Sequence, residues 1–254
     1  MPVPSATHLV LIPSYNSGRK LESTVREALS VWAPVWVVVD GSTDGSDQLL
    51  DPLLSAFPDR LRILRQPVNS GKGSAILAGL RKALAGGYTH ILTMDADGQH
   101  DSGSIATFME ASTKNPDALI LGLPQFDDSA PCERLFGHKI ANFFARLETL
   151  GGNIGDCLFG FRVYPAAALL SVLESTRFAR RYDFDPETAI RLLWRGHPPH
   201  NLATPCRYFK ASEGGISHFK YLRDNILLTW MYARLLIGFF VRLPLLILRR
   251  LTTK

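Results

Sequence analysis

Short apolar runs alternate with amphipathic segments of helical length throughout the first half of the chain. Residues 35–39 are continuously apolar, which is typical of a strand buried on both faces of a sheet. Regular alternation of strands and helices indicates βαβ units, so we expect an α/β fold with a mostly parallel sheet flanked by helices. The pattern predicts strands at residues 8–12, 35–39, 61–64, 91–94 and 118–121, and helices at residues 19–31, 46–57, 72–85 and 104–113.

The second half of the chain is less regular. We expect a long helix over residues 132–150, a turn and short strand over 156–164, a helix over 185–194 and extended chain over 201–208. Asp185-Pro-Glu opens the second helix, where acidic residues and proline suit the first turn. At 254 residues the chain can form one full domain with an appendage, and we place their boundary after residue 217.

The basic residues are unevenly distributed. The net charge is +5, and beyond residue 222 the single acid Asp224 faces six basic residues, namely Arg223, Arg234, Arg242, Arg249, Arg250 and Lys254. The rest of the chain is therefore near neutral, which argues against a general nucleic-acid surface. Three cysteines without metal-ligand spacing favour a reducing compartment, and the amino terminus lacks a signal-peptide pattern. We therefore expect the protein at the cytoplasmic face of the cell membrane, as a peripheral or monotopic protein.

The carboxy-terminal segment is both apolar and basic. Residues 226–248 are rich in Leu, Ile and Phe but interrupted by two arginines, and Pro244 should kink or divide a helix there. Their uncharged stretches are shorter than the ~20 residues that span a bilayer. At 100° per residue, an arc of roughly 100° holds Arg223, Arg234, Arg242 and Arg249. We predict an amphipathic helical tail over residues 218–254 that lies in an anionic membrane interface; the alternative is a helix packed on the core or on a second subunit.

Polar clusters follow four of the predicted strands, at residues 14–18, 40–45, 69–73 and 95–101. Ligands of parallel sheets bind at the carboxyl ends of the strands, because those ends share one edge. The four clusters are therefore expected to form one site.

Two carboxylates in the last cluster, Asp95 and Asp97, are spaced by two residues. Alternate residues of extended chain point to the same side, so both can offer oxygens to one hard cation, and Gln99 can add a third. Such a cation, Mg²⁺ or Mn²⁺, would also hold a diphosphate and neutralise its charge as it departs.

The other clusters suit a nucleotide. Asp40 at a strand end can accept hydrogen bonds from a base or ribose, or can serve a turn. Asn69-Ser-Gly-Lys-Gly places backbone amides and the Lys72 ammonium ahead of a helix amino terminus, which suits an anion, although Lys72 can also be a solvated residue on a glycine turn. P-loop, dinucleotide-binding, EF-hand and serine-hydrolase motifs all fail on inspection. What remains fits a metal-bound nucleoside diphosphate.

Several segments occur in the order seen in family 2 glycosyltransferases. They are Leu11-Ile-Pro-Ser-Tyr-Asn, Val38-Val-Asp-Gly-Ser-Thr-Asp-Gly-Ser, Asn69-Ser-Gly-Lys-Gly and Met94-Asp-Ala-Asp-Gly-Gln-His. Downstream, Asp156-Cys-Leu-Phe-Gly-Phe-Arg resembles a segment of the polyprenol-phosphate (dolichol-phosphate) mannosyl- or glucosyltransferase branch. Over roughly residues 8–217, the chain is similar to that branch.

The resemblance implies a GT-A (Rossmann-like) fold, a GDP- or UDP-hexose donor and a divalent metal. It divides the domain into a nucleotide-sugar-binding half over residues 1–121 and an acceptor-binding half over residues 122–217. By resemblance, the base and ribose contacts are Pro13, Tyr15, Asn16 and Asp40; the metal and diphosphate residues are Asp95, Asp97 and Gln99; and the acceptor-phosphate residues are Arg134 and Arg162.

The chain departs from the family's pattern in five places. Val39 replaces an acid, Ser17 a glutamate, Gly122-Leu-Pro a Gly-Ser-Arg, His138 a serine and His218 a lysine. Three of these changes affect the acceptor side, so the donor chemistry is better supported than a polyprenyl phosphate acceptor.

The acceptor decides the mechanism. A lipid phosphate is already an anion and attacks without a base, but it needs cations, for which Arg134, Lys139 and Arg162 are the candidates. A hydroxyl acceptor needs a general base; Asp156 is the first candidate and His138 the second, although Asp156 can instead be a turn residue. Without an obvious covalent nucleophile, either route is a single inverting displacement.

We therefore predict a metal-dependent inverting glycosyltransferase acting on a membrane lipid, most simply a polyprenyl phosphate, with Asp97, Asp156, Arg134 and Arg162 as its catalytic residues. Two other classes stay open. A nucleotide-sugar-binding scaffold would keep the sheet and Asp40 but tolerate the changes at acceptor positions. A nucleotidyltransferase would need a glycine-rich amino-terminal loop, which is absent.

Overall fold

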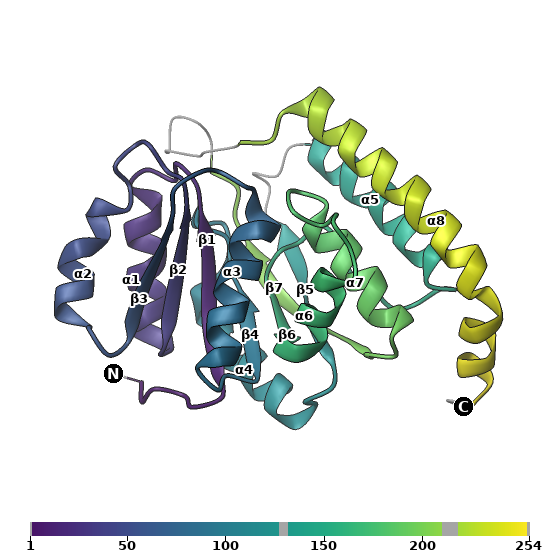
Figure 1. The fold of residues 1–254 in the computed structure, drawn as a ribbon, viewed down its shortest axis with the longest axis horizontal. Helices are drawn as coiled ribbons and strands as arrows, with labels where there is room; N and C mark the ends of the chain where they lie inside the picture. The colour runs from purple at the N-terminus through teal and green to yellow at the C-terminus, as the bar shows by residue number, and fades with distance from the viewer. Residues whose placement is uncertain (1, 127–131, 210–217, 253–254) are drawn as a thin grey trace.

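The computed structural model describes residues 2–126, 132–209 and 218–252, and a seven-stranded sheet forms its centre (Figure 1). The strand order is β3-β2-β1-β4-β6-β5-β7. The pairs are parallel except that β6 runs antiparallel to β4 and β5, which confirms the mostly parallel sheet. The strands are β1 His8–Ser14, β2 Val35–Asp40, β3 Leu61–Gln66, β4 His90–Thr93, β5 Leu119–Phe126, β6 Arg162–Pro165 and β7 Pro199–Cys206.

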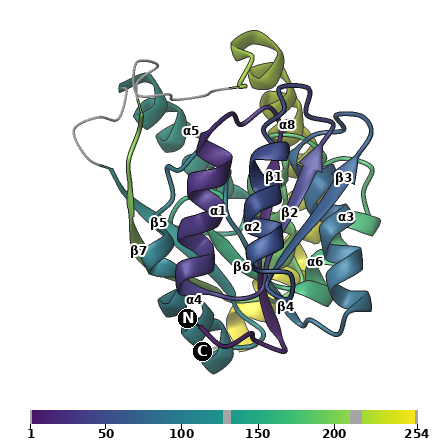
Figure 2. The same cartoon turned by 90° about the vertical axis from the view of Figure 1, so that its left-hand side faces the viewer.

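Both faces of the sheet are covered, and β1 shows why its sequence is apolar without alternation. The pleat sends Leu9 and Leu11 into one hydrophobic cluster and Val10 and Ile12 into the other, and all four are fully buried. One face packs against α1 Lys20–Val31, α2 Asp51–Ala56 and α4 Ile105–Lys114 (Figure 2), and the other against α3 Lys72–Ala85, α6 Ala166–Glu174 and α7 Phe184–Trp194.

Some elements differ from the expected ones. The helix expected at residues 46–57 is a 3₁₀ turn η1, Gln48–Leu50, followed by α2, because Pro52 lacks an amide hydrogen and suits a helix start. A second 3₁₀ turn, η2 Ser102–Ser104, precedes α4. Strand β5 extends to Phe126 because it pairs with β7 along its whole length. Helix α6 was not expected, since its apolar sequence follows β6 without a turn signal.

Two long helices, α5 Cys132–Glu148 and α8 Tyr221–Thr252, pack side by side and against α7, beyond the sheet (Figure 1). Pro244 does not divide α8, which is continuous over 32 residues. By length and composition alone, Tyr221–Leu251 would suffice to cross a membrane, and its most apolar stretch of 18 residues has a mean hydropathy of 1.8. The shortness of its uncharged stretches therefore does not exclude a span.

Three arginines of the expected basic stripe, Arg234, Arg242 and Arg249, are directed at α7, which corrects the interpretation of the stripe as an outward-facing surface of α8. Arg234 forms an ion pair with the buried Glu187 of α7 at 2.8 Å. The Arg242 guanidinium lies 4.9 Å from the ring centre of Trp194, and Arg249 donates to the Trp194 carbonyl. Arginines of one stripe thus attach α8 to α7, because buried acceptors satisfy them better there. The exposed large side chains of α8 are apolar instead, including Ile226, Trp230, Ile237, Phe240, Val241 and Leu248.

Candidate active site

A cleft of about 1440 Å³ lies at the carboxyl ends of the central strands. Residues from all four predicted polar clusters line it, including Tyr15, Asp40, Lys72 and Asp97. The expectation that these clusters form one site is therefore confirmed. The cleft also extends between α5 and α8, where its lining becomes apolar.

Asp40 at the end of β2 holds the loop that follows β3. Its carboxylate accepts hydrogen bonds from the amides of Ser70 at 2.9 Å and Gly71 at 2.7 Å, and from the Asn69 side chain at 3.1 Å. A Cβ atom on Gly41 would lie 2.4 Å from the Asn69 nitrogen, so only glycine permits this approach. The structure gives Asp40 the turn-holding role that the sequence left open, at the wall of the cleft.

Asn16 ties the first two strand-end loops together. The side-chain oxygen of Asn16 accepts a hydrogen bond from the backbone amide of Thr43 at 2.8 Å. The backbone amide of Asn16 donates to the Ser42 hydroxyl at 3.0 Å. The Tyr15 ring lies 5.3 Å from the ring of His218, which also contacts the Asn16 carbonyl at 3.2 Å. Pro13 is buried in β1 and lines the same end of the cleft. These residues form a wall on which a base or ribose can lie.

Lys72, at the start of α3, lies between two carboxylates. Its Nζ is 2.7 Å from Asp95 Oδ1 and 2.7 Å from Asp185 Oδ2. Burial alone would lower the pKa of Lys72, but the Asp185 and Asp95 charges more than offset it, so the pKa is raised. Burial would likewise raise the pKa of Asp95, yet the Lys72 ammonium holds it below its ordinary value. Lys72 is therefore a largely buried cation paired with two carboxylates, which excludes the alternative of a solvated lysine.

Asp185 is a site residue that the sequence analysis missed. It is 5% exposed, lines the cleft from the first turn of α7, and its Oδ1 is buried with no hydrogen-bond partner among the described residues. Asp185-Pro-Glu indicated a helix start, and nothing in the sequence distinguishes a cleft-facing acid from a helix-terminal one. Only the packing of α7 against α3 brings it to Lys72.

Asp97 belongs to a turn rather than to a strand, because β4 ends at Thr93. The expected alternation of strand residues therefore does not place Asp95 and Asp97, although both line the cleft. The amide of Gln99 donates to Asp97 Oδ1 at 3.0 Å, and the Gln99 side chain lines the cleft. Burial, reinforced by the Asp95 charge, raises the pKa of Asp97. Among the described residues, no ion pair joins this carboxyl to a cation.

The acidic turn fits a hard divalent cation that brings further ligands with it. Among the described residues, no three His, Cys, Asp or Glu side chains are grouped as a complete metal cage. Mg²⁺ commonly binds through one or two carboxylates together with substrate phosphates, so an incomplete protein cage is what such a site needs. Asp97, with its raised pKa, and Gln99 offer oxygens, whereas one oxygen of Asp95 is taken by Lys72.

On the acceptor side, His138 of α5 is held by Asp156. Its Nδ1 donates to Asp156 Oδ2 at 2.6 Å, while Asp156 Oδ1 accepts from the amides of Leu158 and Phe159, both at 2.9 Å. Burial would raise the pKa of Asp156, but the hydrogen bond and charge of His138 keep it below its ordinary value. Asp156 is thus ionised, and both of its carboxylate oxygens accept hydrogen bonds from the protein. His138 lines the cleft, and so it precedes Asp156 as the group that can meet a substrate.

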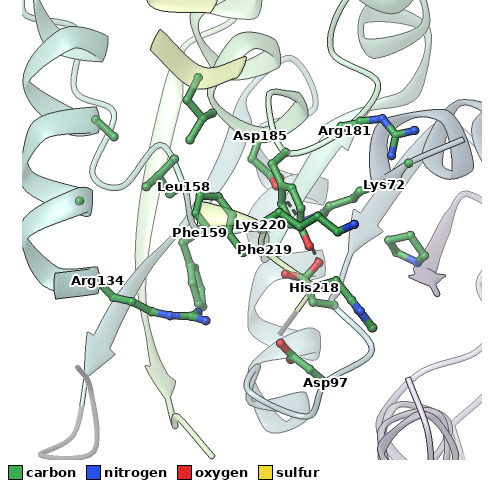
Figure 3. A pocket seen from close by; sticks show the side chains of 18 of the residues that line it. Lys72, Asp97, Arg134, Leu158, Phe159, Arg181, Asp185, His218, Phe219 and Lys220 are labelled. Carbon is green, nitrogen blue, oxygen red and sulfur yellow. Dashed lines mark hydrogen bonds and ion pairs between the residues drawn. The ribbon is translucent and has the colours of Figure 1, made fainter. Parts of the chain in front are cut away.

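The three predicted acceptor cations have different fates. Arg134 lines the cleft on α5, with its guanidinium 5.1 Å from the Tyr208 ring centre, and lies across the pocket from Lys72 and Asp185 (Figure 3). Lys139 is exposed and does not line the cleft.

Arg162 is fully buried, and the prediction that it contacts the acceptor is wrong. Its guanidinium donates to the carbonyls of Phe159, Asp156, Cys157 and Asp185 and contacts the Tyr164 hydroxyl. It therefore links the Asp156 turn to α7 rather than meeting a ligand. Three other cations line the cleft and were missed, because they come from the loop before α7 and from the segment around the start of α8: Arg181, Lys220 and Arg223.

The sheet order, the polar strand ends and the acidic turn in the cleft together define a GT-A glycosyltransferase. Residues 9–173 match the family model described as glycosyl transferase family 2, and the chain belongs to this family.

Similar proteins agree with this assignment. The chain is 32% identical over 198 residues to a polyprenol monophosphomannose synthase of Mycolicibacterium smegmatis, covering 76% of this chain and 72% of that protein. It is 30% identical over 190 residues to an undecaprenyl-phosphate mannosyltransferase of Micrococcus luteus, and the match covers 72% of this chain and 76% of that protein. In fold it resembles glucosyl-3-phosphoglycerate synthase of Mycobacterium tuberculosis, solved with Mn²⁺, uridine diphosphate and phosphoglyceric acid, at a TM-score of 0.65 and 16% identity over 92% of this chain and 78% of that one.

Proposed function

We propose that the protein transfers a hexose from a nucleoside-diphosphate sugar to the phosphate of a polyprenyl phosphate at the cytoplasmic face of the cell membrane. One observation carries the proposal: a single cleft joins the polar strand ends to an apolar groove between α5 and α8. The groove is lined by Ile140, Ala141, Phe144, Leu228, Tyr232 and Leu236. A polar donor and an apolar lipid can therefore meet in one site. The names of the two mannosyltransferase relatives support this acceptor class.

The donor would lie on the strand-end loops. Tyr15, Asn16 and the loop that Asp40 holds form the wall for the nucleoside, as their contacts suggest. Asp95, Asp97 and Gln99 would hold Mg²⁺ or Mn²⁺ against the diphosphate. That cation would neutralise the charge of the departing nucleoside diphosphate. The fold neighbour solved with Mn²⁺ and uridine diphosphate supports such a group.

The acceptor would enter from the α5 side. Arg134 offers a guanidinium whose planar donors match a phosphate, and His138 offers a second polar contact beside it. An acceptor phosphate oxygen would attack the anomeric carbon as the bond from that carbon to the diphosphate oxygen breaks. A single displacement of this kind inverts the anomeric configuration and leaves a sugar phosphodiester.

The exposed surface of α5 and α8 supports binding to a membrane. On α5, a stripe at helical spacing is exposed, namely Phe136, Ile140, Phe143 and Leu147, and α8 beside it exposes its own apolar residues. Apolar side chains in two adjacent helices form a face that suits lipid, since exposed apolar patches of this kind mark interaction sites. The groove for the acceptor lies between the same two helices.

A hydroxyl acceptor is the second candidate. The 2.6 Å contact between His138 and Asp156 favours it, because a histidine oriented by a carboxylate is a common arrangement for a general base. In that case His138 would take the hydroxyl proton and Asp156 would position its ring.

The proposal is tested by release of nucleoside diphosphate from UDP- and GDP-hexoses, with and without Mn²⁺ or Mg²⁺, in the presence of vesicles that contain polyprenyl phosphate. We expect release that needs the metal, one donor and the lipid phosphate together. Asp97→Asn is the inactive control. Metal-independent release, or none with any hexose donor, would contradict the proposal.

A further inference from the structure

The position of Lys72 poses a problem for a metal at Asp95. The ammonium is already 2.7 Å from Asp95 Oδ1, the atom that faces it, and the Lys72 side chain is only 15% exposed. A divalent cation that binds Asp95 at the lone pair that the ammonium occupies must therefore displace the ammonium. The buried ammonium then depends on a second anionic partner that stays in place, since an unpaired charge there is costly.

Asp185 can be that partner. It already holds Lys72 through Oδ2 at 2.7 Å, and its second oxygen, Oδ1, is buried without a hydrogen-bond partner among the described residues. A carboxylate offers about four lone-pair positions, so Asp185 has unused capacity to accept hydrogen bonds. An unpartnered buried oxygen costs stability in the free protein, which is consistent with an atom that acquires a partner in another state.

The backbone confines the ammonium to a narrow space. A Cβ atom on Gly160 would lie 2.5 Å from Lys72 Nζ and 3.1 Å from Asp95 Oδ2. Residue 160 can therefore be only glycine if the ammonium and the carboxylate are to meet. The ammonium therefore cannot move toward the backbone of residue 160, and Asp185 is the carboxylate that already holds it.

In the free protein, the Lys72 ammonium offsets the negative charges of the carboxylates around it. Asp95, Asp97 and Asp185 all line one cleft, and the Asp95 charge already contributes to the raised pKa of Asp97. Lys72 supplies the positive charge that keeps this acidic group compatible with folding before any ligand binds.

We propose that Lys72 is an internal counterion that occupies Asp95 until a divalent metal arrives, and that Asp185 is the positioning residue that retains the displaced ammonium. The inference rests on the metal site of the proposed function and goes beyond it. No covalent bond changes and no proton moves; one ion pair is exchanged for another. Metal affinity is then set partly by Asp185, which need not touch the metal.

A double-mutant cycle tests the exchange without any measurement of activity. Binding of Mn²⁺ to the full chain is followed by electron paramagnetic resonance, with and without uridine diphosphate, for the wild type, Asp185→Asn, Lys72→Met and the double variant. Loss of the Asp185 charge should weaken Mn²⁺ binding about tenfold when Lys72 is present, because the ammonium then holds Asp95 alone. In the Lys72→Met background, the Asp185→Asn substitution should weaken Mn²⁺ binding by no more than about threefold.

Simple charge attraction between Asp185 and Mn²⁺ predicts a different outcome. If Asp185 acts only through its negative charge, Asp185→Asn weakens Mn²⁺ binding equally in both backgrounds, and that result overturns the exchange. Lys82→Met, at an exposed lysine on the same helix, is the matched control and should not change Mn²⁺ affinity. Lys72→Gln replaces Lys72→Met in the cycle if the latter does not fold. Failure of the wild type to bind Mn²⁺ even with the nucleotide would instead contradict the proposed metal site.

Discussion

His138 Nδ1 lies 2.6 Å from Asp156 Oδ2, and this contact changes the roles that the sequence suggested for both residues. Asp156 also accepts the amides of Leu158 and Phe159, so its lone pairs are directed at the protein. The ring of His138 is held in place and lines the cleft. The carboxylate therefore positions the ring, and the imidazole is the member of the pair that faces the cleft.

The pair predicts that two substitutions have similar effects on the kinetics but different effects on stability. His138→Gln should reduce kcat/KM about 100-fold if the ring acts on the acceptor, because a polar contact made in the transition state is lost. Asp156→Asn should lower it by a similar factor and also lower the melting temperature, since it removes a charge that the native state holds with several hydrogen bonds. Steady-state kinetics and thermal melts measure both. A His138→Gln variant with unchanged kinetics would exclude the ring from the reaction.

Substitutions at the two arginines predicted as acceptor ligands should affect different properties, namely stability for Arg162 and the acceptor KM for Arg134. Arg162→Lys should destabilise the protein by about 3 kcal/mol, because buried carbonyl partners are left unpaired, while the folded enzyme keeps its acceptor KM. Arg134→Gln should change stability by less than about 0.5 kcal/mol and raise the acceptor KM about tenfold. Urea unfolding midpoints and acceptor titrations provide the two readouts. The reverse pattern would mean that the burial of Arg162 has been misinterpreted.

Asp97→Asn should make the free protein more stable and the donor complex weaker. The substitution removes a buried charge that lies near Asp95, which should raise stability by about 0.5–1 kcal/mol, as for other functional residues that are held at a cost. It should also abolish the rise in melting temperature that uridine or guanosine diphosphate and Mn²⁺ give the wild type. Ser104→Ala, outside the lining of the cleft, serves as a control for donor binding. A variant that retains the full ligand-induced shift would remove Asp97 from the metal site.

Glu148 at the end of α5 predicts a pH dependence of stability. It is fully buried, both of its oxygens lack partners among the described residues, and burial together with the nearby Glu187 charge raises its pKa to about 8. The folded state therefore binds one proton more than the unfolded state between the ordinary pKa and 8. Stability from this group falls as pH rises through that window, by about 1 kcal/mol per pH unit, and Glu148→Gln should reduce this slope. Equal slopes for wild type and variant between pH 6 and pH 8 would contradict the assignment.

The apolar faces of α5 and α8, rather than the arginine stripe, should hold the protein at membranes. Phe143→Glu combined with Ile237→Glu places charges on side chains that are 63% and 69% exposed, and should weaken sedimentation with vesicles. Arg242→Gln should leave the dependence on anionic lipid unchanged, because that arginine stacks on Trp194. Point substitutions are preferable to removal of α8, since Met231 and Leu235 of α8 are buried in the core.

Local sequence features predicted most of the fold and the donor side of the site. Continuous apolar runs mark strands such as β2, which is buried throughout, and strand-end polar clusters mark the edge where ligands bind. Asp95, Asp97 and Lys72 were found because each lies in such a cluster.

The roles of the other site residues depend on contacts between segments that are distant in the sequence, and local sequence patterns do not predict such contacts. Whether Arg162 meets a ligand or four carbonyls depends on how the Asp156 turn packs on α7. Asp185 reaches Lys72 across 113 residues of sequence. The arginines of α8 have the spacing of a surface stripe, yet buried acceptors on α7 pair with them.

The most direct test of the proposed function compares two acceptors that differ only in the phosphate. Polyprenyl phosphate and the corresponding polyprenol are offered in identical vesicles with the donor and Mn²⁺, and the lipid products are identified by mass spectrometry. The account predicts a hexosyl phosphodiester of the lipid phosphate and no product from the alcohol. Transfer to the alcohol alone would contradict it and would give His138 the role of a general base.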